Sequence, residues 1–312
     1  MWAVLNVDPG LYPSQGYDLI NSRILPIIPK IRISPITGPN IVESLLVSIS
    51  QGEARQLKEI TISSATGSLD PEIFSRAAVK LQILRADLSS VQLEAIFTRS
   101  AATQDSRLRK LYFYHSADIS GMDPEILCQA LLKLKSCPYW VKLSADQVLA
   151  LFSRIKESPD LRPTELLLWW DVSMVPPDVF AGALSRLERV KILGWSRVTP
   201  SQLESLFMLM ISNQEEAGGS KLKQLKFHYT DLTSVSPEVL VGAIQRLENV
   251  AVWIGKMTAD QITAILTMLK GNQKGRLKYV QIFRPSIFGG SVSPTLLQEA
   301  KLNTSVKLSV NI

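Results

Sequence analysis

The feature that most constrains the fold of this 312-residue chain is a helix start that recurs at regular intervals. It consists of a proline directly after a polar or proline cap residue. Proline is favoured at the first helical position because the N–H there has no hydrogen-bond partner within the helix, so its absence costs nothing. Successive prolines lie 53 to 60 residues apart, as from Pro71 to Pro124 and from Pro177 to Pro237. The five starts are Asp70-Pro71, Asp123-Pro124, Pro176-Pro177, Ser236-Pro237 and Ser293-Pro294. Such regular spacing predicts one structural unit stacked many times.

A second type of helix start lies between those of the first type. A threonine or serine is followed three residues later by glutamine or asparagine, a capping box in which each side chain bonds the other residue's backbone N–H. The five are Thr37-x-x-Asn40, Ser89-x-x-Gln92, Ser144-x-x-Gln147, Thr199-x-x-Gln202 and Thr258-x-x-Gln261. In all ten starts the residue before the cap and the residue four after it are apolar, as in a hydrophobic staple. The sequence therefore predicts ten helices.

Short strands are predicted between these helices. Leu222-x-x-Leu225-x-Phe227 and Leu247-x-x-Val250-x-Val252 alternate apolar and other residues, as a strand with one buried face does. Similar segments occur throughout the chain, including 134–139 and, near the end, 306–310. We expect Ile60, Leu111, Leu225 and Val250 to be buried in the core.

This pattern resembles a leucine-rich repeat protein of the helix-bearing subtype seen in ribonuclease inhibitor and in NOD-like receptors. The resemblance implies an α/β solenoid, a horseshoe with a parallel sheet on its concave face and helices on its convex face. It covers residues 28–312, in about ten repeats arranged in alternating pairs. One position departs from the family, which has asparagine or cysteine three residues after the strand. Here that position holds Ala65, Ser116, Asp171, Thr230 and Pro285. The backbone hydrogen bonds of the turn must therefore be made in another way.

Residues 1–27 fit the repeat poorly and are rich in turn-forming residues. We interpret them as a degenerate N-terminal repeat or cap. Two explanations stay open: an irregular native cap, or the cut end of a longer array. The two cysteines, Cys128 and Cys137, are predicted to be small apolar residues of a reducing compartment, which favours a cytoplasmic location. No apolar run is long enough to cross a membrane.

No set of residues in the sequence indicates catalysis. The only histidines, His115 and His228, lie in no nucleophile, metal or phosphate motif, and each is expected to be an exposed residue at the end of a strand. The acidic residues at helix starts, such as Asp70 and Glu238, are explained by capping and by the helix dipole. We therefore expect no enzyme activity, no metal and no cofactor.

The informative residues lie on the strand face opposite the leucines. The position just after each strand is aromatic or imidazole in six of the last seven segments, namely Tyr114, Trp140, Trp169, His228, Trp253 and Phe283. The position between the core residues is often basic or aromatic, as in Arg85, Tyr112, Lys191 and Lys226. Because adjacent strands lie about 4.8 Å apart, these side chains are expected to form an exposed ribbon that binds a ligand.

Two interpretations of this ribbon compete. Aromatic residues have high strand propensity and could simply fill a broad sheet. An exposed apolar patch, however, usually marks a binding site, and tryptophan and tyrosine are enriched in interface hot spots. We favour a non-catalytic module that binds a protein partner, and the net charge of +6 favours an acidic one. The family resemblance implies roles in immune-type receptors or ubiquitin-ligase adaptors. Nucleic-acid binding through the same face is a weaker alternative, because the charge excess is modest and no dedicated motif occurs. A purely structural scaffold is the third possible function.

Overall fold

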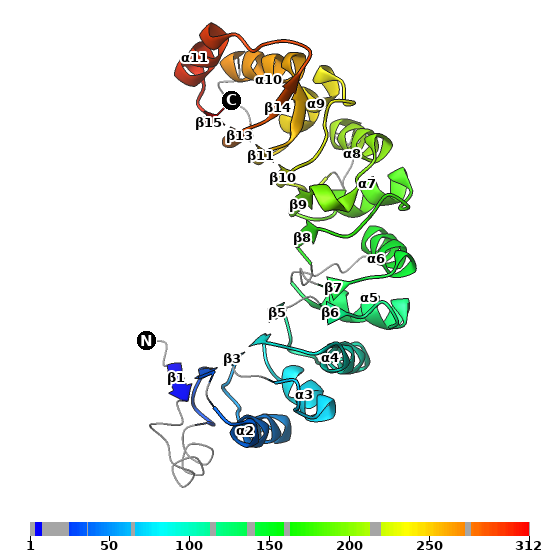
Figure 1. Cartoon of the computed structure of the whole chain (residues 1–312), viewed down its shortest axis with the longest axis vertical. Coiled ribbons are helices and arrows are strands. Elements are labelled where there is room, and N and C mark those ends of the chain that lie inside the picture. The colour runs from blue at the N-terminus through cyan, green and yellow to red at the C-terminus, as the bar shows by residue number, and fades with distance from the viewer. Residues whose placement is uncertain are drawn as a thin grey trace. The chain divides into compact units, whose positions relative to one another are not determined.

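The structure is a computed structural model of the whole chain, and it describes residues 4–7, 25–35, 37–63, 66–112, 117–135, 141–158, 163–212, 220–271 and 276–311. The chain divides into two compact units, Met1–Gln147 and Val148–Ile312, and each is described by itself. In both, strands alternate with helices along the chain, and within each unit the helices lie on one side of the strands (Figure 1).

The first unit contains a five-stranded parallel sheet in which spatial order follows chain order. Its strands are β1 (Val4–Val7), β2 (Lys30–Ile33), β3 (Glu59–Ile62), β4 (Ile83–Ala86) and β5 (Lys110–Tyr112). Its helices are α2 (Pro39–Gln51), α3 (Pro71–Ala78), α4 (Ser90–Ala102) and α5 (Pro124–Lys133). Consecutive helices pack side by side. A short parallel pair, β6 (Ala117–Asp118) and β7 (Val141–Lys142), lies in the same unit. Helix α6 (Ala145–Glu157) begins there and continues into the second unit.

The second unit contains a six-stranded parallel sheet, again with strands in chain order. Its strands are β8 (Glu165–Leu168), β9 (Arg189–Leu193), β10 (Gln224–His228), β11 (Asn249–Trp253), β13 (Tyr279–Phe283) and β15 (Lys307–Asn311). Its helices are α7 (Pro177–Ser185), the 3-10 turn η2 (Gly194–Ser196), α8 (Pro200–Ser212), α9 (Pro237–Ile244), α10 (Ala259–Gly271) and α11 (Pro294–Asn303). A second short parallel pair consists of β12 (Lys256–Thr258) and β14 (Ser286–Phe288).

The core lies between each sheet and its helices, because alternate strand residues point toward the helix layer. The four residues predicted to be core are buried: Ile60 and Leu225 are 0% exposed, Val250 is 3% and Leu111 is 4%. The strand predicted at 306–310 forms as β15 and pairs with β13. The strand predicted at 134–139 lies partly outside the described residues.

Four of the five predicted capping boxes are present. The hydroxyls of Ser89, Ser144, Thr199 and Thr258 each accept a hydrogen bond from the backbone N–H three residues later. The fifth prediction, a cap at Thr37, is wrong. Helix α2 begins after Gly38, with Pro39 as its first residue, and the Thr37 hydroxyl instead donates to the Val7 carbonyl. Proline at the first helical position sets the start one residue later.

The glutamine of each capping box has a further role that the sequence did not reveal. All four glutamines are 0% exposed, and each uses its whole side-chain amide. In Gln202, Oε1 accepts from Thr199 N at 2.9 Å, and Nε2 donates to the carbonyls of Val172 and Val175, each at 2.7 Å. The same three bonds are made by Gln92, Gln147 and Gln261. The two carbonyls belong to the turn before the preceding helix. The buried glutamines therefore bond backbone groups of the turns, in chains of repeats that lack the asparagine which the family uses for such bonds.

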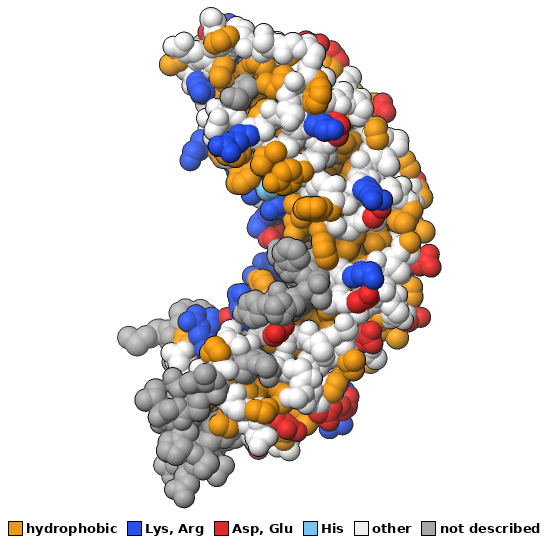
Figure 2. Space-filling model, in the orientation of Figure 1, with side chains coloured by type: hydrophobic (Ala, Val, Ile, Leu, Met, Phe, Trp, Pro, Cys, Tyr) orange, Lys and Arg blue, Asp and Glu red, His pale blue; other side chains and the backbone are white. Residues whose placement is uncertain are grey.

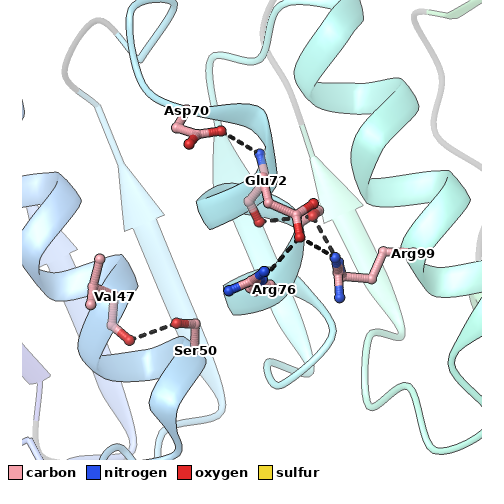
Figure 3. Close-up of polar contacts among 7 residues, drawn as sticks. Val47, Ser50, Asp70, Glu72, Arg76 and Arg99 are labelled. Atoms are coloured by element: carbon pink, nitrogen blue, oxygen red, sulfur yellow. Dashed lines mark hydrogen bonds and ion pairs between the residues drawn. The ribbon is translucent and has the colours of Figure 1, made fainter.

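Four of the five helix starts of the first type are capped by an exposed side chain, and the fifth, at Pro176, has no side-chain cap. Asp70 accepts a hydrogen bond from Glu72 N at 2.8 Å, and the Glu72 carboxylate contacts Arg76 at 2.9 Å and also Arg99 of the next helix (Figure 3). Exposed ion pairs of this kind contribute little stability each. Within the described residues, no helix combines the length and the apolar character needed to cross a bilayer.

Candidate functional site

The second unit presents one face of its sheet away from the helices. In β10, Leu225 and Phe227 are buried in the core, whereas Gln224, Lys226 and His228 point to the other side and are only partly covered. The same alternation holds for β9, which pairs with β10, and for β13, which lies beyond β11. We call this side the open face. Because the strands pair in register, each open-face position forms a row that crosses the sheet.

Three rings form a contiguous row on the open face. His228, Trp253 and Phe283 are register partners on the adjacent strands β10, β11 and β13. The His228 and Trp253 rings stack with centroids 5.0 Å apart, and the Trp253 and Phe283 centroids are 5.7 Å apart at an angle of 45°. Such spacing is favourable for aromatic pairs. We call these three residues the aromatic ribbon.

Trp253 is held in place by a hydrogen bond across the sheet. Its Nε1 donates to Oε1 of Gln281 at 3.0 Å, so the indole reaches back toward the row that contains Ala251 and Gln281. Ala251 is 2% exposed although it lies on the open face. We infer that the indole covers it, and that a small side chain at this position gives the ring its room. The indole nevertheless keeps part of its surface free, since Trp253 is 38% exposed.

Two lysines lie beside the ribbon. Lys191 of β9 and Lys226 of β10 are register partners, and both side chains are half-buried. Neither forms an ion pair with any residue that the structure describes, whereas Lys223 contacts Glu188 at 3.2 Å and Lys278 contacts Glu248 at 2.7 Å. We call Lys191 and Lys226 the lysine pair.

The lysine pair affects the protonation of its surroundings. Burial lowers the pKa of Lys191, and the neighbouring charge of Lys226 lowers it further. Burial, followed by the charges of Lys191 and Lys226, lowers the pKa of His228 to about 4. His228 is therefore neutral at pH 7 and stacks as an uncharged ring.

The residues that follow the ribbon have an unusual backbone. Tyr229, Ile254 and Arg284 adopt left-handed conformations, with φ of 55°, 51° and 46°. Each is held by one more ladder hydrogen bond beyond the strand end, such as Tyr229 N to Trp253 O at 3.0 Å and Ile254 N to Phe283 O at 2.8 Å. Tyr229 is 60% exposed and Ile254 is 38% exposed. A bulky or β-branched residue in this conformation is strained, and such strain often occurs at functional sites. We call these three residues the strained edge.

A close backbone approach supports this edge. A Cβ atom on Gly194 would lie 2.7 Å from both Cβ and O of Tyr229, so only glycine fits beside it. The next residue, Trp195, is 72% exposed. The sequence did not reveal the strained edge, because tyrosine, isoleucine and arginine are not residues that signal a left-handed turn. It also did not reveal Trp195, which lies in η2 beyond the end of β9. The one available signal was Gly194 at the end of β9.

Figure 2 shows this region of the second unit as hydrophobic side chains around one histidine, with lysine or arginine side chains next to them. The histidine is His228, since His115 lies outside the described residues. The arrangement offers apolar and cationic surface together. It can bind a ligand that is partly apolar and partly anionic.

The other predicted site residues are placed differently. Tyr114 and Trp140 lie outside the described residues. Trp169 is half-buried just after β8, and Leu193 occupies the register position next to His228. The structure thus joins three of the six predicted ring positions into one row.

The first unit shows a different balance of charge on its sheet. The guanidinium of Arg85 lies 4.0 Å from the centre of the Tyr112 ring, so these two predicted residues do meet. Glu59 pairs with Lys30 at 2.7 Å and with Arg85 at 3.4 Å. Burial would raise the pKa of Glu59, but Lys30 and Arg85 outweigh it and lower that pKa. These two cations share the Glu59 carboxylate, whereas the lysine pair contacts no carboxylate of a described residue.

Among the residues that the structure describes, no three histidine, cysteine, aspartate or glutamate side chains are grouped as metal ligands would be. Cys128 is buried, and Cys137 lies outside the described residues.

Comparison with known proteins gave little. No protein-family model and no curated protein matches the chain. Among solved structures, one similar chain is an internalin from Listeria monocytogenes, with 10% sequence identity and a TM-score of 0.44. The match covers 91% of this chain and 81% of the internalin chain. At that level the similarity carries no argument about what this chain binds or does.

Proposed function

We propose that this chain is a non-catalytic protein-binding module, built as a leucine-rich repeat solenoid of the helix-bearing, ribonuclease-inhibitor-like type. Parallel strands in chain order, one helix layer per unit and buried aliphatic residues at alternate strand positions support this architecture. The resemblance of the sequence to receptor and adaptor repeats points to recognition as the role. No reaction is part of the proposal.

The observation that carries the proposal is the exposed apolar surface formed by the aromatic ribbon together with Tyr229 and Ile254 of the strained edge. Trp253, Tyr229 and Ile254 lie at the ends of two adjacent strands and are all exposed, as is Trp195 one strand further on. A folded chain gains nothing by leaving these apolar side chains in water, because burial of apolar surface stabilises by about 25 cal/mol per Å². Aromatic anchors held rigidly at the centre of a patch are typical of interface hot spots.

The test is capture of a partner by matched variants. The full chain, its Trp253→Ala variant and a Met208→Ala control are immobilised and exposed to extract of cells that express the protein. Met208 is 49% exposed on α8, in the helix layer, so the control removes a similar exposed apolar side chain elsewhere. We expect a protein that wild type and control retain and Trp253→Ala loses, with a loss of about 2 kcal/mol in binding to the purified partner.

Other outcomes contradict the proposal. If Trp253→Ala keeps the partner but melts far below wild type, the ribbon is packing and the working surface lies elsewhere. If nuclease removes everything that the open face retains, the module binds nucleic acid by ring stacking. An open face that retains nothing would favour a structural scaffold.

A further inference from the structure

The lysine pair places two positive charges side by side on the open face of the second unit, and neither lysine forms an ion pair with a described residue. Its row is formed by Leu167, Lys191, Lys226, Ala251, Gln281 and Ser309, and the ribbon's row is continued by Leu193 and Asn311. None of these side chains is acidic. In-register parallel strands lie about 4.8 Å apart, so two ammonium groups on neighbouring strands repel each other. Two other lysines of the unit, Lys223 and Lys278, are each paired with a glutamate.

We propose that the lysine pair receives the carboxylate of an aspartate or glutamate in an extended acidic segment of a protein partner, and that an apolar side chain two residues along this segment packs on the aromatic ribbon. This inference rests on the proposed protein-binding function and specifies the partner's chemistry. A carboxylate between the two ammonium groups would remove their repulsion.

The spacing of the two subsites fits an extended peptide. Lys226 and His228 are two residues apart on β10, which is about 6.6 Å along a strand. Two side chains on the same side of an extended peptide, at positions i and i+2, have the same separation. An acidic residue over the lysine pair therefore places its i+2 neighbour over the ribbon, next to His228 and Trp253.

The same features disfavour the other anions. The sheet's own ladder uses the backbone N–H groups of the open-face strands, so no backbone cradle for a phosphoryl group forms there. A nucleic-acid strand requires a series of phosphate contacts, and the two rows supply one pair of lysines. A single carboxylate matches the charge that is present.

The experiment uses the full chain and random heptapeptides displayed on phage. Selection is run on wild type, on the Lys191→Met/Lys226→Met variant and on a Lys278→Met control, whose lysine is already neutralised by Glu248. Methionine keeps the apolar stem and removes a repelling charge, so folding is expected to persist; a melting curve checks this, and the single Lys226→Gln variant replaces the double one if it fails. On wild type and control we expect enrichment of aspartate or glutamate two positions from an aromatic or large aliphatic residue. On the double variant we expect the apolar preference alone.

The most enriched peptide is then synthesised with its glutamate or with glutamine in its place, and binding is followed by fluorescence polarisation. The change to glutamine should weaken binding to wild type and to the control about tenfold, and to the double variant less than about twofold. An equal effect on all three chains overturns the lysine subsite. Displacement of the peptide by a ten-nucleotide oligothymidylate overturns it in favour of nucleic acid.

Failure of this inference can be told apart from failure of the proposed function. Peptides that need Trp253 but show no preference for an acidic residue would leave the binding module in place and remove the carboxylate subsite. The absence of any enriched peptide would overturn the extended segment as the occupant, while capture of a folded partner would still decide the proposed function.

Discussion

Tyr229 and Ile254 place large side chains where glycine would be the more stable residue. For L-amino acids the left-handed region costs about 1–2 kcal/mol, and glycine avoids this cost. The ladder hydrogen bonds on both sides fix the backbone, so the strain cannot relax. The side chains that it projects are exposed, and therefore little of this cost is returned by packing.

This strain predicts an inverted order of stability at position 254. In ordinary strands alanine is more stabilising than glycine, but Ile254→Gly should be more stable than Ile254→Ala by about 1 kcal/mol. Chemical denaturation of both variants measures the difference. The same pair at Gln281, an ordinary strand position of β13, is the control and should show the usual order. If the alanine variant is more stable than the glycine variant at both positions, Ile254 is not strained.

At the scale of residues, sequence alternation predicted the ribbon because side-chain direction in a strand depends only on parity. It placed His228, Trp253 and Phe283 in one row without knowledge of any contact. It could not predict that Trp253 bonds Gln281, or that Lys191 and Lys226 form no ion pair with a described residue. Both depend on which strands are neighbours and on where the acidic residues of the second unit lie.

Among the elements, the buried glutamines connect helices that follow each other in the chain. Gln202 belongs to α8, yet its Nε2 holds the turn in front of α7. The amide makes three bonds and is inaccessible to water, so its loss would leave two carbonyls and one N–H without partners. Unsatisfied buried groups cost about 1–3 kcal/mol each.

Gln202→Leu, which keeps the volume and removes the amide, should therefore lower the free energy of unfolding by about 3 kcal/mol or more. Gln298→Leu on α11 is the matched control, because that glutamine is exposed, and its effect should be within about 0.5 kcal/mol. Denaturant midpoints measure both. A Gln202→Leu chain as stable as the control would mean that the three bonds contribute nothing net.

Element starts were the most predictable part of the fold. Cap, staple and glutamine agreed at Ser89, Ser144, Thr199 and Thr258, and all four helices begin there. At Thr37 the same letters misled, because Pro39 competes for the start and asparagine replaces glutamine. The reach of the glutamine into the preceding turn was hidden, since the capping-box pattern describes only local bonds.

At the scale of the whole chain, a second kind of contact recurs in both units. Asp118, Asp171 and Asp231 each accept two hydrogen bonds from the serine or threonine two residues later. Each also pairs with a cation 24 to 26 residues further on, namely Lys142, Arg197 and Lys256.

These contacts lower the pKa of all three aspartates. The bond from Lys142, followed by those from Ser120, lowers the pKa of Asp118. The bonds from Ser173 and the charge of Arg197 lower the pKa of Asp171. For Asp231, burial acts in the opposite direction but is outweighed by Thr233 and Lys256.

These directions predict sensitivity to acid. A carboxyl whose pKa is lower in the folded state stabilises folding above its unfolded pKa, near 3.8 for aspartate, and that stability is lost as the pH falls through the folded value. His228 acts in the same direction between pH 6.5 and about 4, because the unfolded chain binds its proton first. Denaturation midpoints should therefore fall steadily from pH 7 to pH 3. In the Asp171→Asn variant the decline below pH 4 should be shallower, and an unchanged slope would contradict the assignment.

The repeat pattern predicted parallel strands and one helix layer, but it gave no indication of the division between Gln147 and Val148. That division falls inside α6, where caps and apolar spacing continue without change. Local sequence patterns describe each helix and strand by itself. A division into units depends on how many tertiary contacts join the residues on either side of a position in the chain. The strand β1 was likewise missed, since Val4–Val7 lies in a segment dominated by turn formers.

The buried glutamines also bear on how such an array could lengthen during evolution. A recombination break between a turn and the second helix after it would separate a glutamine from its two carbonyls, and both products would carry buried groups without partners. A break between the end of a glutamine-bearing helix and the turn before the next proline start would leave each glutamine with its two carbonyls. Duplication in steps of two helices would keep these bonds intact, and such steps match the alternation of the two kinds of helix start and the interval of 53 to 60 residues between prolines.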